Sequence, residues 1–113
     1  MQTQTPVSVP QMTPQELKAR LDAGDDIYLL DVRELHERDI CNIGGELIPM
    51  GTVAANLARI PKDKDVIVYC RSGGRSDRIA QELVRLHGYT KVANLAGGML
   101  RWSDDIDPTM RKY

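Results

Sequence analysis

Apolar and polar residues alternate along the chain in blocks that predict strands and helices in turn. Two continuous apolar runs, IYLL at 27–30 and VIVY at 66–69, are typical of strands covered on both faces. Shorter runs predict three further strands: VSV at 7–9, LIP at 47–49 and KVANL at 91–95. Because helical segments separate these runs, we expect an α/β fold with a mostly parallel sheet of about five strands and helices on both faces.

The first helix is expected within residues 13–24, which carry their own start and stop signals. Thr13 is a good N-cap, Pro14 suits the first helical position, and Glu16 completes a capping box. Gly24 follows the last turn, and glycine at that place is typical of a helix end.

Further helices are expected over residues 34–39, 52–60 and 76–88, and after Gly98. In the third of these, Ile79, Leu83 and Leu86 recur at helical spacing and predict the buried side. In the last, we expect Met99 and Trp102 to pack onto the sheet.

Length and charge limit the classes of protein to which the chain can belong. With 113 residues it fits one compact domain, which we place at 7–113 after a polar, disordered lead-in at 1–6. Lys and Arg number 15 against 16 Asp and Glu, so neither nucleic acid nor a membrane surface is an expected partner. No apolar run reaches the roughly 20 residues of a membrane-spanning helix, and the start lacks signal-peptide character, which favours a cytoplasmic protein.

The two cysteines, Cys41 and Cys70, stand in different local settings. Their separation argues against a disulfide framework and favours a reducing compartment with one working thiol. Cys41 lacks an activating neighbourhood, so we expect a packed small residue; a thiol that resolves an adduct on Cys70 is the alternative. His36 and His87 are too scattered to complete a metal site, and we expect neither a metal nor a cofactor.

The segment CRSGGRS begins at Cys70, directly after the VIVY strand. In parallel sheets ligands bind beyond the carboxyl ends of the strands, which is where this cysteine is expected. Gly73 and Gly74 let successive backbone N–H groups converge on one point, and the helix that follows adds partial positive charge. Arg71 and Arg75 add full charges. Together these residues predict an anion cradle around a cysteine thiolate.

Three interpretations of Cys70 stay open on the residues alone. A small buried cysteine beside a plain turn is the simplest, but the arginines and the helix start favour a reactive thiol. Tyrosine phosphatases place five residues between the cysteine and the arginine of their phosphate loop, whereas Arg75 follows Cys70 after four. We expect the shorter ring to be too tight for a phosphate monoester and to fit a single sulfur atom. A short-loop phosphatase remains the alternative.

Three motifs resemble those of the rhodanese family of sulfurtransferases, and together they cover almost all of the chain. They are LLDVRE at 29–34, YCRSGGRS at 69–76 and VANLAGGMLRW at 92–102. The resemblance implies a single rhodanese domain in which Cys70 takes the outer sulfur of a donor, such as thiosulfate or another persulfide. A nucleophilic acceptor then removes that sulfur from the cysteine.

The resemblance also assigns roles to the residues around Cys70. The backbone amides of the loop would hold the persulfide, and Arg75 would close the ring. The loop residues are Arg71, Ser72, Gly73, Gly74 and Arg75. Asp31, Arg33 and Ser76 would support the loop; a surface ion pair is the simpler interpretation of Asp31 and Arg33.

Two less common stretches, ICNIGGELIPMG at 40–51 and DDIDPTMRKY at 104–113, resemble the C-terminal rhodanese domain of adenylyltransferase-and-sulfurtransferase proteins. Those proteins activate ubiquitin-like sulfur carriers. The resemblance therefore implies such a carrier as acceptor and a persulfide donor such as a cysteine desulfurase. The chain has no room for the adenylating domain, so a separate enzyme would supply that step. A non-catalytic rhodanese-fold docking module is a further alternative, although such modules usually lack the cysteine.

Overall fold

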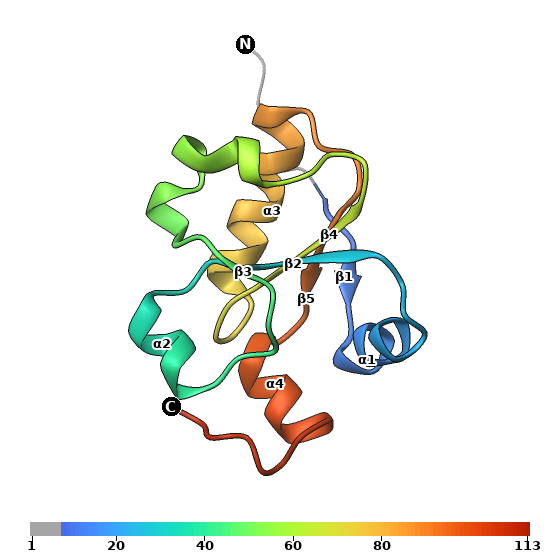
Figure 1. Ribbon diagram of the computed structural model, residues 1–113, viewed down its shortest axis with the longest axis vertical. Coiled ribbons are helices and arrows are strands. Elements are labelled where there is room, and N and C mark those ends of the chain that lie inside the picture. Colours follow the sequence, from blue (N-terminus) through green and yellow to red (C-terminus); the bar gives the residue numbers. More distant parts are fainter. Residues whose placement is uncertain (1–7) are drawn as a thin grey trace.

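A computed structural model describes residues 8–113, and within this range a five-stranded sheet forms the centre (Figure 1). The strands are β1 (Gln11–Met12), β2 (Ile27–Asp31), β3 (Glu46–Leu47), β4 (Asp65–Tyr69) and β5 (Val92–Leu95). The α-helices are α1 (Pro14–Asp22), α2 (Leu35–Ile40), α3 (Gly74–His87) and α4 (Gly98–Asp105). The sheet order is β1-β5-β4-β2-β3, and every neighbouring pair is parallel. The expected α/β architecture is confirmed.

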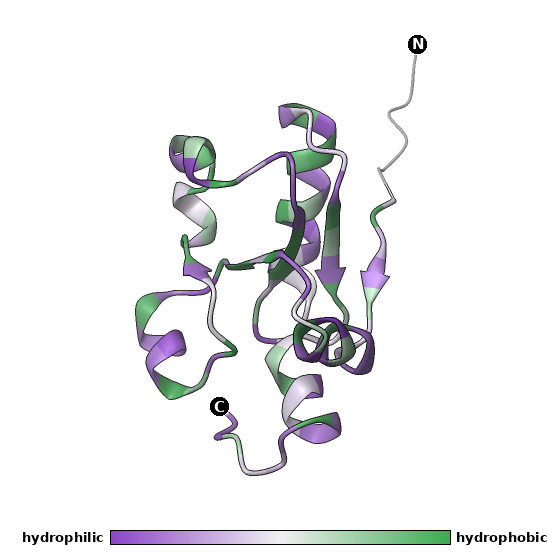
Figure 2. Ribbon diagram, turned by 45° about the vertical axis from the view of Figure 1, so that its right-hand side comes forward, coloured by the Kyte–Doolittle hydropathy of each residue, from purple (hydrophilic) through white to green (hydrophobic). Residues whose placement is uncertain are grey.

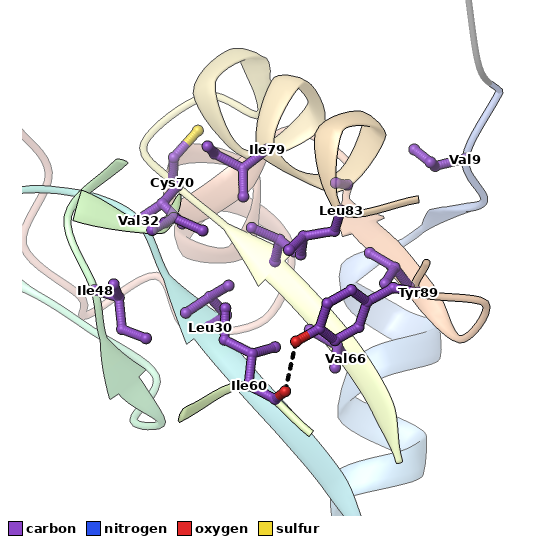
Figure 3. Packing of buried hydrophobic residues seen from close by; sticks show 14 residues of the cluster. Val9, Leu30, Val32, Ile48, Ile60, Val66, Cys70, Ile79, Leu83 and Tyr89 are labelled. Carbon is purple, nitrogen blue, oxygen red and sulfur yellow. Dashed lines mark hydrogen bonds between the residues drawn. The ribbon is translucent and has the colours of Figure 1, made fainter. Parts of the chain in front are cut away.

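The two faces of the sheet carry separate apolar clusters, because alternate strand residues point to opposite sides. The first cluster packs the sheet against α3, and Figure 3 shows Cys70 at its edge beside Val32 and Ile79. Its members include Leu30, Val66, Val68, Leu83, Tyr89 and Val92. The second cluster packs the sheet against α1 and α4 and includes Leu17, Leu29, Ile67, Tyr69, Leu95, Met99 and Trp102. Figure 2 shows hydrophobic colouring along the central strands, as expected for strands covered on both faces.

The start of α1 follows local sequence signals. The Glu16 N–H donates to the Thr13 hydroxyl at 3.1 Å, and the Thr13 N–H donates to the Glu16 carboxylate at 2.9 Å. This reciprocal pair is the predicted capping box, and Pro14 occupies the first helical position. Gly24 follows the helix with a φ of +78°, which glycine adopts without strain.

Residues 52–60 were expected to form one helix, and the structure has only 3₁₀ helix there, interrupted by a kink. The chain instead forms two 3₁₀ segments, η1 (Met50–Thr52) and η2 (Ala54–Arg59). Side chains compete with the helical backbone here: the Thr52 hydroxyl donates to the Pro49 carbonyl, and the Asn56 amide donates to the Thr52 carbonyl. Asn56 accordingly has a non-helical backbone, with a φ of −124°.

Two smaller expectations also differ from the structure. Leu86 is exposed rather than buried, because Tyr89 folds back under the end of α3 and its hydroxyl donates to the Ile60 carbonyl at 2.6 Å (Figure 3). The first strand is β1 rather than residues 8–9 of the VSV run, and it pairs Gln11 with Asn94 and Met12 with Leu95 of β5. Val7 and the lead-in at 1–6 lie outside the described residues. Within residues 8–113, no helix is both long enough and apolar enough to cross a membrane.

Candidate active site

Cys70 follows the last residue of β4 directly, and its side chain is buried. The first turn of α4 binds the carbonyls at this turn: the Met99 N–H donates to the Cys70 oxygen at 2.9 Å, and the Leu100 N–H donates to the Arg71 oxygen at 3.0 Å. A Cβ on Gly98 would lie 2.5 Å from the Cys70 oxygen, so glycine is required for this approach. Because α4 takes the carbonyls, the N–H groups further along the loop can face the sulfur.

Two backbone N–H groups and one hydroxyl lie within hydrogen-bond distance of the Cys70 sulfur. The N–H groups of Gly73 and Ser76 lie 3.1 and 3.4 Å from Sγ, and the Ser76 hydroxyl lies 3.3 Å from it. Gly73 caps α3 with a φ of +103°, so the helix begins at Gly74, two residues earlier than the sequence predicts. The sulfur therefore lies against the N-terminus of a 14-residue helix, where the helix dipole favours negative charge.

Arg75 forms a two-point ion pair with Glu37 of α2, with N–O distances of 2.8 and 2.7 Å. The hydrogen bonds from Arg75 are the main cause that lowers the pKa of Glu37 to about 2, against the opposing effect of burial. The same pair raises the pKa of Arg75 above its ordinary value. Glu37 also accepts the Glu34 N–H at the start of α2. The guanidinium that the resemblance places in the ring is thus already neutralised by a carboxylate.

Asp31 and Arg33 form a fully buried ion pair, so the interpretation as a surface pair is wrong. Both N–O distances of the pair are 2.9 Å. Arg33 also donates to the carbonyl oxygens of Cys41 at 2.7 Å and of Glu37 at 3.4 Å. Burial by itself lowers the pKa of Arg33, but the hydrogen bonds to Asp31 and Tyr113 outweigh it and raise the pKa above its ordinary value. Through these bonds the Asp31–Arg33 pair holds α2 in place, and α2 in turn contacts the cysteine loop through Glu37.

The last described residues return to α2, as Figure 1 shows. The Tyr113 hydroxyl donates to the Glu37 carboxylate and accepts from the Arg33 guanidinium, both at 2.9 Å. Arg71 lies over the Tyr113 ring, 5.1 Å from its centroid, and its Nε donates to the Tyr113 backbone oxygen at 2.7 Å. Arg71 therefore binds an oxygen acceptor beside the cysteine loop.

Within residues 8–113, Ser72, Gly74 and the second cysteine make no hydrogen bond to the Cys70 sulfur. Ser72 and Gly74 are exposed, and they line an open hollow of about 300 Å³ on the outer side of the loop. Cys41 packs against the second apolar cluster, whereas Cys70 belongs to the first. The sheet lies between the two clusters, which supports the prediction that Cys41 is a packed residue.

Sequence reasoning missed four residues that contact the site: Gln11, Glu37, Asn94 and Tyr113. Asn94 bonds to Ser76, which in turn touches the Cys70 sulfur. The sequence could have indicated that Asn94 is buried. It is the only polar residue of β5 and points to the same side of the sheet as the buried Val92, so it needs a hydrogen-bond partner there. Glu37 and Tyr113 reach the loop through tertiary contacts, and no local pattern points to them.

The fold and the loop define a class of protein: a parallel α/β domain with a buried cysteine whose sulfur receives hydrogen bonds at a helix N-terminus. Residues 13–105 match the rhodanese-like domain family. A sulfurtransferase of Allochromatium vinosum is 36% identical over 96 residues, which cover 84% of this chain and 89% of that relative. The chain therefore belongs to the rhodanese-like domain family, as the motifs predict.

Longer proteins and solved structures are also similar to this chain. A Mycobacterium tuberculosis protein named as a probable adenylyltransferase/sulfurtransferase, MoeZ, is 36% identical over 105 residues, 90% of this chain and 26% of the relative. The chain thus spans about a quarter of the length of that protein. The crystal structure of a rhodanese-like domain protein from Staphylococcus aureus has a TM-score of 0.76 and 30% identity, covering 86% of this chain and 94% of that one. The predicted likeness to adenylyltransferase and sulfurtransferase proteins is confirmed.

Proposed function

We propose that this protein is a sulfurtransferase that carries sulfane sulfur as a persulfide on Cys70. The observation that carries the proposal is the convergence of the Gly73 and Ser76 N–H groups on one sulfur atom at a helix N-terminus, with the Ser76 hydroxyl within reach of the same atom. These donors stabilise negative charge on sulfur, in the thiolate and in the persulfide anion that replaces it. The names of the relatives, which include sulfurtransferases, support the same reaction class.

The reaction has two displacements on sulfur. The Cys70 thiolate attacks the outer sulfur of thiosulfate, a new S–S bond forms, and sulfite leaves with the electron pair of the bond that breaks. A thiolate or cyanide acceptor then attacks the terminal sulfur of the persulfide, and the Cys70 thiolate leaves with its electron pair. Neither step needs a metal or an external redox agent.

The surroundings of the loop favour sulfur over phosphate chemistry. A phosphatase loop needs a cation to bind the dianionic ester, and both terminal nitrogens of the Arg75 guanidinium are bound by the Glu37 carboxylate. Arg71, in contrast, contacts a single backbone oxygen at Tyr113 and has the geometry to hold one oxygen of an anionic donor. We assign it that role at the mouth of the site.

The acceptor that we propose is a ubiquitin-like sulfur carrier, loaded at its C-terminus after a separate enzyme has adenylated it. The support is the likeness to the rhodanese portion of a protein whose name combines adenylyltransferase and sulfurtransferase. The donor would be thiosulfate or the persulfide of a protein such as a cysteine desulfurase.

Intact mass spectrometry after incubation with thiosulfate tests the proposal directly. We expect the mass of the protein to rise by about 32 Da, the mass of one sulfur atom, and cyanide or dithiothreitol to remove the gain. Cys70→Ser is expected to take up no sulfur, whereas Cys41→Ser, the matched control on the other sheet face, is expected to label fully. Absence of any adduct with thiosulfate and with a persulfide donor would refute sulfur transfer. Turnover of para-nitrophenyl phosphate that Cys70→Ser abolishes would favour the phosphatase.

A further inference from the structure

A line of hydrogen-bonded polar side chains runs from Cys70 to the surface. The Ser76 hydroxyl lies 2.5 Å from Asn94 Oδ1, Asn94 Nδ2 lies 2.9 Å from Gln11 Oε1, and Gln11 Nε2 lies 2.8 Å from Asp77 Oδ1. Ser76 and Asn94 are buried, with exposed fractions of 0% and 2%. Gln11 is the direct strand partner of Asn94 in the β1–β5 pair, which brings their side chains together on one face. Buried polar groups in such a line have few other partners, so their orientations are coupled.

The carboxylate at the end of the line sets the direction of every hydrogen bond in it. An ionised carboxylate only accepts, so the Gln11 amide must present its NH₂ group to Asp77 and its oxygen to Asn94. Asn94 must then present its NH₂ group to Gln11 and, at 3.3 Å, to the Gly73 carbonyl, and its oxygen is left facing Ser76. A second amide, from Gln81, also donates to Asp77 at 2.8 Å and confirms the acceptor role of that carboxylate.

Ser76 has one hydroxyl hydrogen and three acceptors within reach. Asn94 Oδ1 lies at 2.5 Å, the Gly73 carbonyl at 3.2 Å and Cys70 Sγ at 3.3 Å. The shortest contact assigns the hydrogen to Asn94, and the Ser76 oxygen then presents a lone pair to the sulfur, which suits a protonated thiol. A thiolate or persulfide anion would instead be stabilised if the hydroxyl hydrogen turned to the sulfur.

We infer that Asn94 is a positioning residue that competes with the Cys70 sulfur for the Ser76 hydroxyl hydrogen and so controls how readily the thiol loses its proton to solvent. This inference rests on the proposed function, in which the deprotonated sulfur is the nucleophile. Asn94 touches neither donor nor acceptor and acts through Ser76. Its effect is to draw the hydroxyl hydrogen away from the sulfur and to release it once negative charge forms there.

The charged groups around this sulfur are Arg71 in the loop, Arg75 with its partner Glu37, and Asp77 in the first turns of α3. A test of Asn94 must leave all of them in place. Asn94→Leu removes the competing oxygen and keeps the branched shape of the side chain, and Ser76→Ala removes the hydroxyl itself.

The pH dependence of alkylation by iodoacetamide, in a Cys41→Ser background, reports thiolate formation at Cys70. We expect Asn94→Leu to move the midpoint to lower pH by about one unit, the effect of one hydrogen bond to a charged group, and Ser76→Ala to move it to higher pH. In the Ser76→Ala background, Asn94→Leu is expected to have no further effect. An unchanged midpoint in Asn94→Leu, or an equal shift in both backgrounds, would overturn the inference.

A variant outside the core keeps the test decisive if Asn94→Leu does not fold. Gln11→Leu changes an exposed side chain and removes the nearer of two acceptors that hold the Asn94 NH₂ group, the Gly73 carbonyl being the other. The Asn94 oxygen is then held less firmly against Ser76, so the midpoint is again expected to fall, by less than in Asn94→Leu. Gln15→Leu, on an exposed glutamine that binds Asp105, is the matched control and is expected to leave the midpoint unchanged. A Gln11→Leu midpoint equal to that of the control would refute the inference. Since alkylation needs no sulfur donor, such a result would leave the mass-spectrometric test of sulfur transfer untouched.

Discussion

The guanidinium of Arg75 lies on the carboxylate of Glu37, with both nitrogens within 2.8 Å of its oxygens. The first residue belongs to the N-terminal turn of α3 beside the cysteine loop, and the second belongs to α2. This contact joins two segments that are 38 residues apart in the chain. The ion pair holds α2 against the cysteine loop. The geometry of the loop and the stability of the fold at acid pH therefore depend on the same contact.

Glu37→Gln is predicted to make the stability of the fold depend less on pH in the acid range. The pKa of Glu37 is lowered from 4.5 to about 2, so its contribution to stability is fully present above about pH 4.5 and is lost as the pH falls toward 2. Calorimetric melting between pH 5 and 2 is expected to show a steeper fall in Tm for the wild type than for the variant. Glu46→Gln, which removes an exposed partner of Arg59, is the control and is expected to keep the wild-type slope. Parallel curves for wild type and Glu37→Gln would contradict the prediction.

Asp31→Ala is predicted to destabilise the fold strongly, because it leaves the buried Arg33 without its carboxylate. Loss of one partner from a buried pair typically lowers the free energy of unfolding by about 3–5 kcal/mol. Urea unfolding of Asp22→Ala, which breaks an exposed pair with Lys18, is expected to change that free energy by about 0.5 kcal/mol or less. Adding Arg33→Leu to Asp31→Ala is expected to restore part of the loss. A loss as small as that of the Asp22 variant would show that the buried pair is not supporting α2.

Gly98→Ala is predicted to disturb the turn at Cys70. An alanine Cβ would lie 2.5 Å from the Cys70 carbonyl oxygen, and the φ of +56° is unfavourable for any residue with a Cβ. We expect a loss of about 2 kcal/mol or more in the free energy of unfolding, together with slower alkylation of Cys70.

Two glycine controls separate the causes of that effect. Gly24 has a similar positive φ with open space around it, so Gly24→Ala is expected to show the backbone strain alone, about 1 kcal/mol. Gly51→Ala adds a Cβ that meets nothing within 4 Å and is expected to change little. If Gly98→Ala were no worse than Gly24→Ala, the close approach of α4 to the Cys70 carbonyl would not matter for stability.

Local patterns predicted the elements whose formation depends on neighbours in the chain. The capping box of Thr13 and Glu16 forms as expected, and the apolar runs of β2 and β4 are buried on both faces. The helix expected at 52–60 forms only as kinked 3₁₀ segments, because the side chains of Thr52 and Asn56 compete with the backbone there. Leu86 was predicted to be buried and is exposed, because Tyr89, beyond the end of α3, covers that part of the core.

The sequence by itself determined the α/β architecture, the position of Cys70 at a strand end, and the family, because these depend on periodicity, turn chemistry and contiguous motifs. Only the tertiary structure decided what surrounds the sulfur. The pairing of Arg75 with Glu37, the burial of Asp31 and Arg33, and the line through Ser76 and Asn94 join side chains from different elements. Apart from the position of Asn94 in the buried strand β5, these contacts have no local sequence pattern. A charged or polar residue has the same sequence pattern on a surface as in a buried pair, since only packing removes the water around it.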